Sequence, residues 1–249
     1  MVAIQYTDSG PAVRVGAAGS ALARAALAAM DAPSVHDARP WRWRIDGDRA
    51  ELRADRAGWL PDDPDGRLVT VSGGAALHHA TVALAGDGVG VAVRRLPDAA
   101  QPDLLAIVHH TGPAERPARA LRLHRAIALR HSDRRAPTDG LVSGATVESL
   151  REAAEGAGAA LWPLGPRPTR FAIAAGGDGP HAWLAAGEAL SAVLLTAAAE
   201  GLATSVERFL TAPEAAGSAA WLPAGAGVAA VVVGIAPAGR IGVPKGGQP

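Results

Sequence analysis

Two stretches of equal length, GAALHHATVALAGDGV (residues 74–89) and GEALSAVLLTAAAEGL (residues 187–202), align without a gap and determine the expected fold. Both begin Gly-x-Ala-Leu, and both carry a second glycine fourteen positions after the first, at Gly88 and Gly201. Alanine-rich helices match by chance fairly often, so the repeat alone is suggestive. It predicts two similar halves around a pseudo-two-fold axis, with their shared interface as the natural place for a pocket.

The composition is that of a folded globular protein with few special chemical groups. At 249 residues and 49% hydrophobic content, the chain can bury a large core as one broad domain or as two packed halves. Basic and acidic residues number 24 each, so no basic face is expected and nucleic acid is not a predicted partner. The chain has no cysteine, which excludes disulfides, thiolate catalysis and cysteine-ligated metals.

The N-terminal sequence MVAIQYTDSG has no basic region followed by an apolar run, so no secretory signal is expected. The longest apolar stretches, LSAVLLTAAA and VAAVVVGIA, are shorter than the roughly 20 residues of a membrane-spanning helix. A cytoplasmic protein that does not cross a membrane is therefore predicted.

Helical and strand patterns alternate irregularly along the chain. Trp41, Trp43 and Ile45 alternate with arginines before the turn DGD and the returning segment RAELRAD, which predicts a hairpin with one apolar face. Further strands are expected over 89–95, 104–109, 159–164, 170–175 and 228–235. Helices are expected over 17–30, 68–86, 120–130, 145–156 and 181–200. The lack of a strict strand–helix–strand order favours an α+β fold. The segment TGPAERPAR breaks regular structure, so the halves are predicted to be residues 1–115 and 116–249.

The loop LRHSDRRAPTDG (residues 129–140) opens the second half and carries candidate phosphate ligands. Arg130 and Arg134 alternate with the hydroxyl of Ser132, and guanidinium groups bind phosphate oxygens in pairs. Lys245, in the C-terminal VPKGGQP, is a further candidate. The alternative for the loop is a solvated basic segment that pairs with nearby aspartates. The alternative for Lys245 is an exposed lysine in a glycine-rich tail.

The turn APSVHDARPWRWRI (residues 32–45) is the candidate partner of that loop. Ser34 can direct its hydroxyl or amide into a pocket, and Trp43 can line a flat apolar slot. The alternative is a helix end that leads into a hairpin, with Trp41 and Trp43 in the core. His78 and His79 are adjacent on a helix and point in different directions, and no zinc motif occurs, so no metal site is predicted.

These motifs together resemble those of nitroreductase-family flavoproteins. That family carries an Arg-x-Ser-x-Arg phosphate loop, a Pro-Ser-x-x-Asn-x-Gln-Pro-Trp turn, an inner helix with a glycine-rich end and a basic tail. The chain is most similar to the actinobacterial Acg-like branch, in which two nitroreductase halves are fused. The segments APSVHDARPWRWRI, GGAALHHATVAL, RHSDRR and WLAAGEALSAVLLTAAAEGLATS match that branch in order, over about residues 20–245.

The resemblance implies a nitroreductase-like pseudo-dimer within one chain and a single FMN at the interface of its halves. The turn from Pro33 to Trp41, including Ser34, would lie against the isoalloxazine ring. The phosphate would be held by Arg130, Ser132, Arg134 and Lys245. The chain would act as a monomer or as a homodimer.

Two residues of the turn depart from the family pattern. Asp37 replaces the usual Asn and can only accept hydrogen bonds, and Arg39 replaces the usual Gln. Arg39 either supplies positive charge toward the pyrimidine edge of the ring or pairs with Asp37. Between Ala160 and Trp183 the chain also lacks a segment that covers the flavin in the relatives, which implies an open site or one covered by a second chain.

The implied function is an FMN-dependent oxidoreductase that passes hydride from NAD(P)H to an electron-poor small molecule. Two alternatives stay open. The chain is either an FMN-sequestering protein with little turnover, or a cofactor-free scaffold that serves as a binding module.

Overall fold

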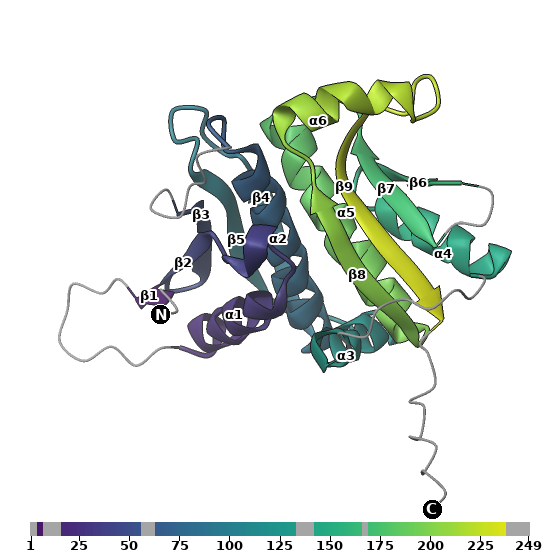
Figure 1. Ribbon diagram of the computed structural model, residues 1–249. Helices are drawn as coiled ribbons and strands as arrows, with labels where there is room; N and C mark the ends of the chain where they lie inside the picture. Colours follow the sequence, from purple (N-terminus) through teal and green to yellow (C-terminus); the bar gives the residue numbers. More distant parts are fainter. Residues whose placement is uncertain (1–3, 7–15, 56–62, 133–141, 166–168, 238–249) are drawn as a thin grey trace, which may run out of the picture.

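The computed structural model describes residues 4–6, 16–55, 63–132, 142–165 and 169–237. Two β-sheets flank a central pair of long helices, α2 (Arg67–Gly86) and α5 (Pro180–Ala199) (Figure 1). Helices and strands are mixed throughout, as the sequence predicted, and the architecture is α+β.

The sheet of the N-terminal part has five strands in the order β1-β2-β3-β5-β4. The strands are β1 (Ile4–Tyr6), β2 (Trp41–Asp46), β3 (Arg49–Ala54), β4 (Val89–Arg95) and β5 (Leu104–Pro113). Only β1 and β2 pair in parallel within this sheet. The second sheet has the order β6-β7-β9-β8. Its strands are β6 (Ala159–Pro163), β7 (Arg170–Ala175), β8 (Leu202–Phe209) and β9 (Val228–Pro237).

The order of elements in the first part of the chain recurs in the second. Helix α1 (Ala17–Ala28) precedes the β2-β3 hairpin as α4 (Gly144–Glu155) precedes the β6-β7 hairpin. Helices α2 and α5 follow the hairpins, and each leads into an edge strand, β4 or β8. Corresponding strands therefore occupy corresponding places in the two sheets. The remaining helices are α3 (Ala118–Ser132) and the short α6 (Ala212–Ala216).

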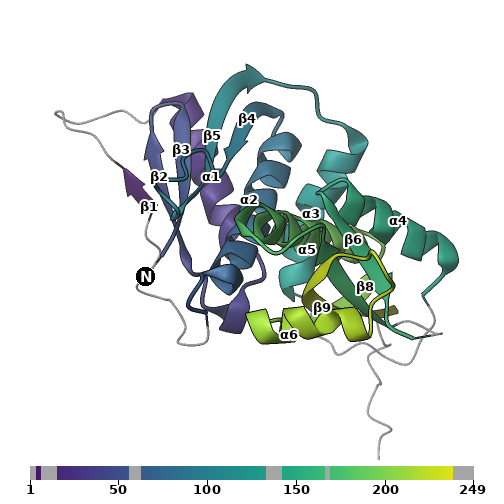
Figure 2. The ribbon, with the colours of Figure 1, turned by 90° about the horizontal axis from the view of Figure 1, so that it is seen from above.

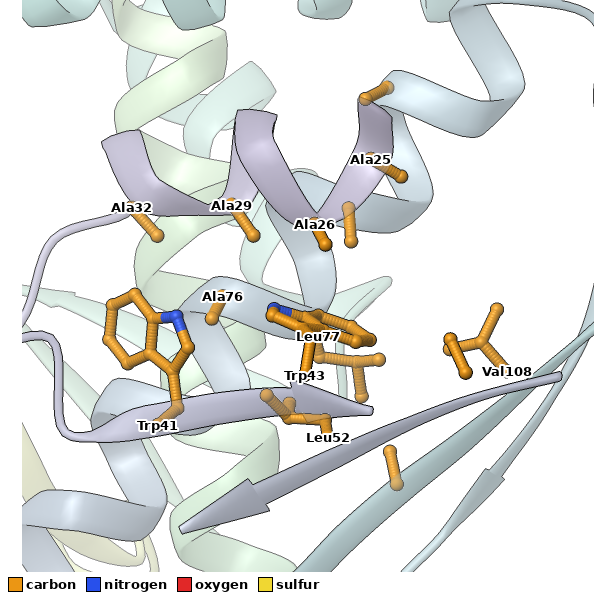
Figure 3. Close-up of a cluster of buried hydrophobic side chains, with 14 of the residues drawn as sticks. Ala25, Ala26, Ala29, Ala32, Trp41, Trp43, Leu52, Ala76, Leu77 and Val108 are labelled. Atoms are coloured by element: carbon orange, nitrogen blue, oxygen red, sulfur yellow. The ribbon is translucent and has the colours of Figure 1, made fainter. Parts of the chain in front are cut away.

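The β2-β3 hairpin buries alternate residues, as its sequence pattern predicted. Trp41, Trp43 and Ile45 are buried, and the intervening residues of β2 are exposed. Figure 3 shows the two tryptophan rings between β2 and a row of alanines, with two residues of α2 beside them: Ala25, Ala26, Ala29 and Ala32 in the row, and Ala76 and Leu77 of α2. Both tryptophans are therefore core residues, as the alternative interpretation of the turn predicted, and Trp43 does not line a flat apolar slot.

Helices α2 and α5 approach closely where each carries the first glycine of its repeat. A Cβ on Gly74 would lie 2.1 Å from the Leu184 carbonyl oxygen, and a Cβ on Gly187 would lie 1.9 Å from the Val71 carbonyl oxygen. Only glycine fits at either position, because the obstacle is backbone. Both helices are long and apolar enough to cross a membrane, but 83% and 67% of their apolar windows are buried inside the protein. They serve as core helices here.

Arg67, the first residue of α2, connects this helix to the second sheet through hydrogen bonds. Its side chain is 2% exposed, its Nε donates to the Leu210 carbonyl at 3.2 Å, and one terminal nitrogen donates to the Ala229 carbonyl at 2.9 Å. The other terminal nitrogen pairs with Asp178. Burial lowers the pKa of Arg67, and the Asp178 carboxylate opposes that shift.

Three elements were not predicted: β1, β8 and α6. The segment around the proposed division of the chain runs from the end of β5 at Pro113 to the start of α3 at Ala118. The division at residue 115 stays a prediction.

Candidate functional site

The turn between α1 and β2 has an unusual backbone. His36, Asp37 and Arg39 adopt positive φ angles of 50°, 54° and 50°. Left-handed backbone costs energy for any residue with a Cβ, so surrounding contacts must hold it. Clusters of such residues are typical of ligand-binding turns.

Hydrogen bonds from inside and outside the turn fix this backbone. The Val35 amide donates to Ser72 Oγ of α2 at 3.1 Å, and the Arg39 amide donates to Ser34 Oγ at 3.0 Å. The Ser72 hydroxyl in turn donates to the Leu68 carbonyl at 2.7 Å. The oxygen of Ser34 is thus engaged in holding the turn, and its hydroxyl proton is the part that a ligand can use.

The α2 segment beneath the turn is itself anchored at its N-terminus. The carboxylate of Asp63, which is 3% exposed, accepts from the amides of Leu68 and Val69 at 3.0 and 3.1 Å. These bonds satisfy amides of the first helical turn that have no partner within the helix. The helix that carries Ser72 is therefore capped at its start by a buried carboxylate.

A pocket of about 390 Å³ lies between this turn, the C-terminal part of α3 and the edge strand β8. A volume of this size is within the range of small-molecule sites. The residues that line it are Met30, Asp31, Ala32, Pro33, Ser34, Asp37, Arg39, Arg130, Thr204, Ser205 and Val206.

Five of the eight residues predicted for the site line this one pocket: Pro33, Ser34, Asp37, Arg39 and Arg130. Ser132 is the last residue of α3, the helix that carries Arg130. Arg134 and Lys245 lie outside the described residues. The structure thus brings together the turn and the first arginine of the loop.

Arg130 connects α3 to the segment that precedes the turn. Its guanidinium donates to the carbonyl of Asp31, which belongs to the short 3-10 turn Ala29–Asp31 that precedes Pro33. The positive charge of Arg130 is therefore held at the edge of the pocket.

Asp37 and Arg39 do not form the ion pair that the sequence left open, since no salt bridge joins these two described residues. The Nε atom of Arg39 is buried and has no hydrogen-bond partner within the described part of the chain. A buried, unpartnered donor on a cation is costly, so a ligand that accepts from it is favoured.

A second cavity, of about 550 Å³, adjoins the first at this turn. It shares Ser34, Asp37 and Val206 with the first pocket and extends to His36 and to Arg208 of β8. Arg208 is paired with Glu214 at 2.8 Å. Both cavities have volumes within the range of small-molecule sites.

Three lining residues were missed because β8 was not predicted: Thr204, Ser205 and Val206. The repeat contained the necessary signal. It aligns Val89 with Leu202, and these residues begin the corresponding strands β4 and β8.

The two adjacent histidines lie where α2 meets α5. Nδ1 of His78 and Nδ1 of His79 each lie 2.7 Å from the buried hydroxyl of Ser191. Burial, and then the charges of Arg119 and Arg95, lower the pKa of His78 to about 4. Burial and the charge of Arg130 lower the pKa of His79 well below its ordinary value. Both rings are neutral at pH 7. No metal-binding cluster occurs among the residues that the structure describes.

Comparison with known proteins finds relatives in Mycobacterium tuberculosis, whereas no protein-family model matches. The chain is 37% identical over 135 residues to "Putative NAD(P)H nitroreductase Rv3131", a match that covers 53% of this chain and 39% of the relative. It is 36% identical over 108 residues to "Putative NAD(P)H nitroreductase acg", covering 43% of this chain and 32% of the relative.

These matches span less than half of the relatives' own length. Taken with the α+β fold and the pocket, they show that this chain is similar to proteins named as NAD(P)H nitroreductases.

Proposed function

We propose that the protein is an FMN-dependent oxidoreductase that passes hydride from NAD(P)H, through bound FMN, to an electron-poor small-molecule acceptor. The observation that carries the proposal is a single pocket lined by both the Pro33–Arg39 turn and Arg130. The similarity to proteins named as NAD(P)H nitroreductases supports the same reaction class. When bound, FMN supplies the hydride chemistry, and the protein supplies binding, orientation and charge.

The phosphate end of the site is assigned to Arg130, together with Ser132, Arg134 and Lys245. Arg130 lies close to the C-terminus of α3, where the helix dipole disfavours an anion. The attraction for a phosphate must therefore come from side-chain cations, and guanidinium groups suit phosphate oxygens in pairs.

The ring end is assigned to the turn. Arg39 would supply a donor and a positive charge toward the pyrimidine edge of the bound ring, where a positive charge favours the reduced form. The unpartnered Nε of Arg39 supports this role. Asp37 accepts a hydrogen bond from a donor on the ligand, and Ser34 donates its hydroxyl proton.

The same proposal describes the chain as two nitroreductase-like halves, residues 1–115 and 116–249, fused into a pseudo-dimer. Support comes from the matching strand orders of the two sheets and from the reciprocal contact of Gly74 and Gly187. In a two-fold arrangement, each partner offers the same patch to the other, and these glycines are equivalent positions of the repeat. A cytoplasmic location and a monomeric or homodimeric state are part of this prediction.

The test is anaerobic reduction of the purified, FMN-loaded protein by NADH and by NADPH. The proposal expects the oxidised-flavin absorption to bleach with at least one of them and to recover when an electron-poor acceptor such as a nitroaromatic compound is added. Tight FMN retention without reduction by either nucleotide would instead identify an FMN-sequestering protein. Failure to bind FMN at all would identify a cofactor-free scaffold.

A further inference from the structure

A larger cavity, of about 840 Å³, lies between the two parts of the chain. It shares no lining residue with the pocket of about 390 Å³ that the turn and Arg130 line, which we call the cofactor pocket. We call the larger cavity the β4 cavity. It is lined by β4 of the first sheet, by α2 and α5, by the N-terminal part of α3 and by the end of α4. Helix α3 packs against α2 and α5 (Figure 2). It contributes Arg119 to the lining of the β4 cavity and Arg130 to the lining of the cofactor pocket.

The β4 cavity is the counterpart of the cofactor pocket in the repeated order of elements. The cofactor pocket lies between edge strand β8 and the link from α1 to β2, and the β4 cavity lies between edge strand β4 and the end of α4. The first link has twelve residues (29–40), but the link from α4 to β6 has only three (156–158). The short link supplies no turn that could fill the cavity or contact a flavin ring, so the β4 cavity suits a different ligand.

One wall of the cavity is apolar. Val89, Val91 and Val93 are alternate residues of β4, so their side chains share one face of this edge strand. All three are only partly buried, and Leu123 of α3 lines the same cavity. Ala153, Gly156 and Ala157 at the end of α4 are small and leave the space open. A flat apolar body fits such a wall.

The polar groups of the cavity leave one cation for a ligand. Arg95 is committed to Glu188, which it binds through two hydrogen bonds of 2.7 and 2.8 Å. His78 lines the same cavity, and its Nδ1 is hydrogen-bonded to the Ser191 hydroxyl. Arg119 is exposed and has no ion-pair partner within the described part of the chain. Helix α3 also contains no acidic residue that could pair with Arg119.

We propose that the β4 cavity binds a small organic monoanion with a flat apolar body, such as an aromatic carboxylate, whose charge pairs with Arg119 while its body lies on the β4 valines. This site is separate from the cofactor pocket and does not depend on bound flavin.

The first test compares 2-naphthoate with the neutral 2-naphthamide by isothermal titration calorimetry on the full chain. The carboxylate binds about tenfold more tightly than the amide, as expected for a charge-assisted hydrogen bond. The Arg119→Gln variant binds the two compounds equally. The matched control is Arg122→Gln, an exposed arginine of the same helix that does not line the cavity, and it binds like the unchanged protein.

The second test concerns the apolar wall. Val91→Asn weakens binding of both compounds by about tenfold, because it places an amide against the apolar body. Ala92→Asn, on the exposed opposite face of β4, changes neither. Saturation with FMN leaves the affinity for naphthoate unchanged.

The proposal is overturned by any of four results: no binding of naphthoate, equal binding of acid and amide by the unchanged protein, an equal loss in the Arg119 and Arg122 variants, or competition between naphthoate and FMN. The last result would place naphthoate in the cofactor pocket. Naphthoate binding is measured independently of flavin reduction. A failure of the β4-cavity proposal therefore does not affect the proposed oxidoreductase function, and a failure of that function does not affect the β4-cavity proposal.

Discussion

Gly74 and Gly187 face each other across the contact of α2 and α5. A Cβ on Gly74 would lie 3.0 Å from the Gly187 Cα and 2.1 Å from the Leu184 carbonyl oxygen, and a Cβ on Gly187 would meet the Val71 carbonyl oxygen at 1.9 Å. Val71 and Leu184 stand three residues before their respective glycines. The contact is therefore reciprocal between equivalent positions of the repeat, and it sets how closely the two parts of the chain pack.

The Gly74→Ala variant tests this contact. Backbone cannot move aside as a side chain can, so we expect a loss of about 3 kcal/mol or more in the free energy of unfolding, measured by urea denaturation. Gly144→Ala is the control, because nothing lies within 4 Å of a Cβ at this first residue of α4, and the change there should be below about 1 kcal/mol. Equal stability of the two variants would contradict the close approach of α2 and α5.

Arg67→Leu is expected to destabilise the protein strongly. The substitution removes the donors of the Leu210 and Ala229 carbonyls, which then stay buried without a hydrogen bond. It also removes the ion-pair partner of Asp178. Each buried carbonyl left without a donor costs about 1–3 kcal/mol. Arg151→Leu removes an exposed pair with Glu148 and should change the free energy of unfolding by less than about 1 kcal/mol. Thermal and urea unfolding of both variants would measure the difference, and a mild effect at Arg67 would rule out its anchoring role.

The histidine pair predicts a pH dependence of stability. The pKa of His78 is about 4 in the folded protein, below its ordinary value of 6.5. Between pH 4 and pH 6.5 the unfolded chain therefore binds more protons at this residue than the folded protein does. Stability is thus fully present above pH 6.5 and falls as the pH drops toward 4, by up to about 1.4 kcal/mol per pH unit for each such group. Urea unfolding at pH 7 and pH 5 should show a smaller drop for His78→Gln than for His181→Gln, an exposed control. Equal drops would argue against a neutral, buried His78.

The Arg39→Gln variant tests the charge at the ring end of the pocket. If Arg39 stabilises the anionic reduced flavin, its loss lowers the midpoint potential of bound FMN, by on the order of 30 mV for an effect of about 1.4 kcal/mol. The potential is read by equilibration with a reference dye. Arg42→Gln, on the exposed face of β2 and paired with Asp55, should leave the potential unchanged. An unchanged potential in Arg39→Gln would exclude this role.

Local patterns predicted most of the fold, and the exceptions have physical causes. The alternation of Trp41, Trp43 and Ile45 specified the hairpin, since one face of β2 is buried and the other exposed. Burial along β8 does not alternate cleanly, and a shift in its register against β9 between Val206 and Arg208 interrupts the period of two that marks a strand. Helix α6 is short, and its local signals were the capping box formed by Thr211 and Glu214 and the proline in its first turn, Pro213.

Only separate parts of the candidate site could be predicted from the sequence. The turn and the arginine loop each have a recognisable pattern, but the bond from Arg130 to the Asp31 carbonyl joins residues 99 positions apart. No local period encodes such a contact. The left-handed backbone of Asp37 and Arg39, which are not glycines, also follows from the hydrogen bonds of Ser34 and Ser72 rather than from residue preference.

The most direct test of the central claim, a flavin phosphate held by Arg130 beside the turn, is the affinity of cofactor-free protein for FMN and for riboflavin, which lacks the phosphate. The unchanged protein and the Arg125→Gln control should prefer FMN, and Arg130→Gln should lose at least about tenfold of its FMN affinity while keeping its affinity for riboflavin. Equal binding of the two flavins by the unchanged protein, or an FMN preference that survives in Arg130→Gln, would contradict the claim.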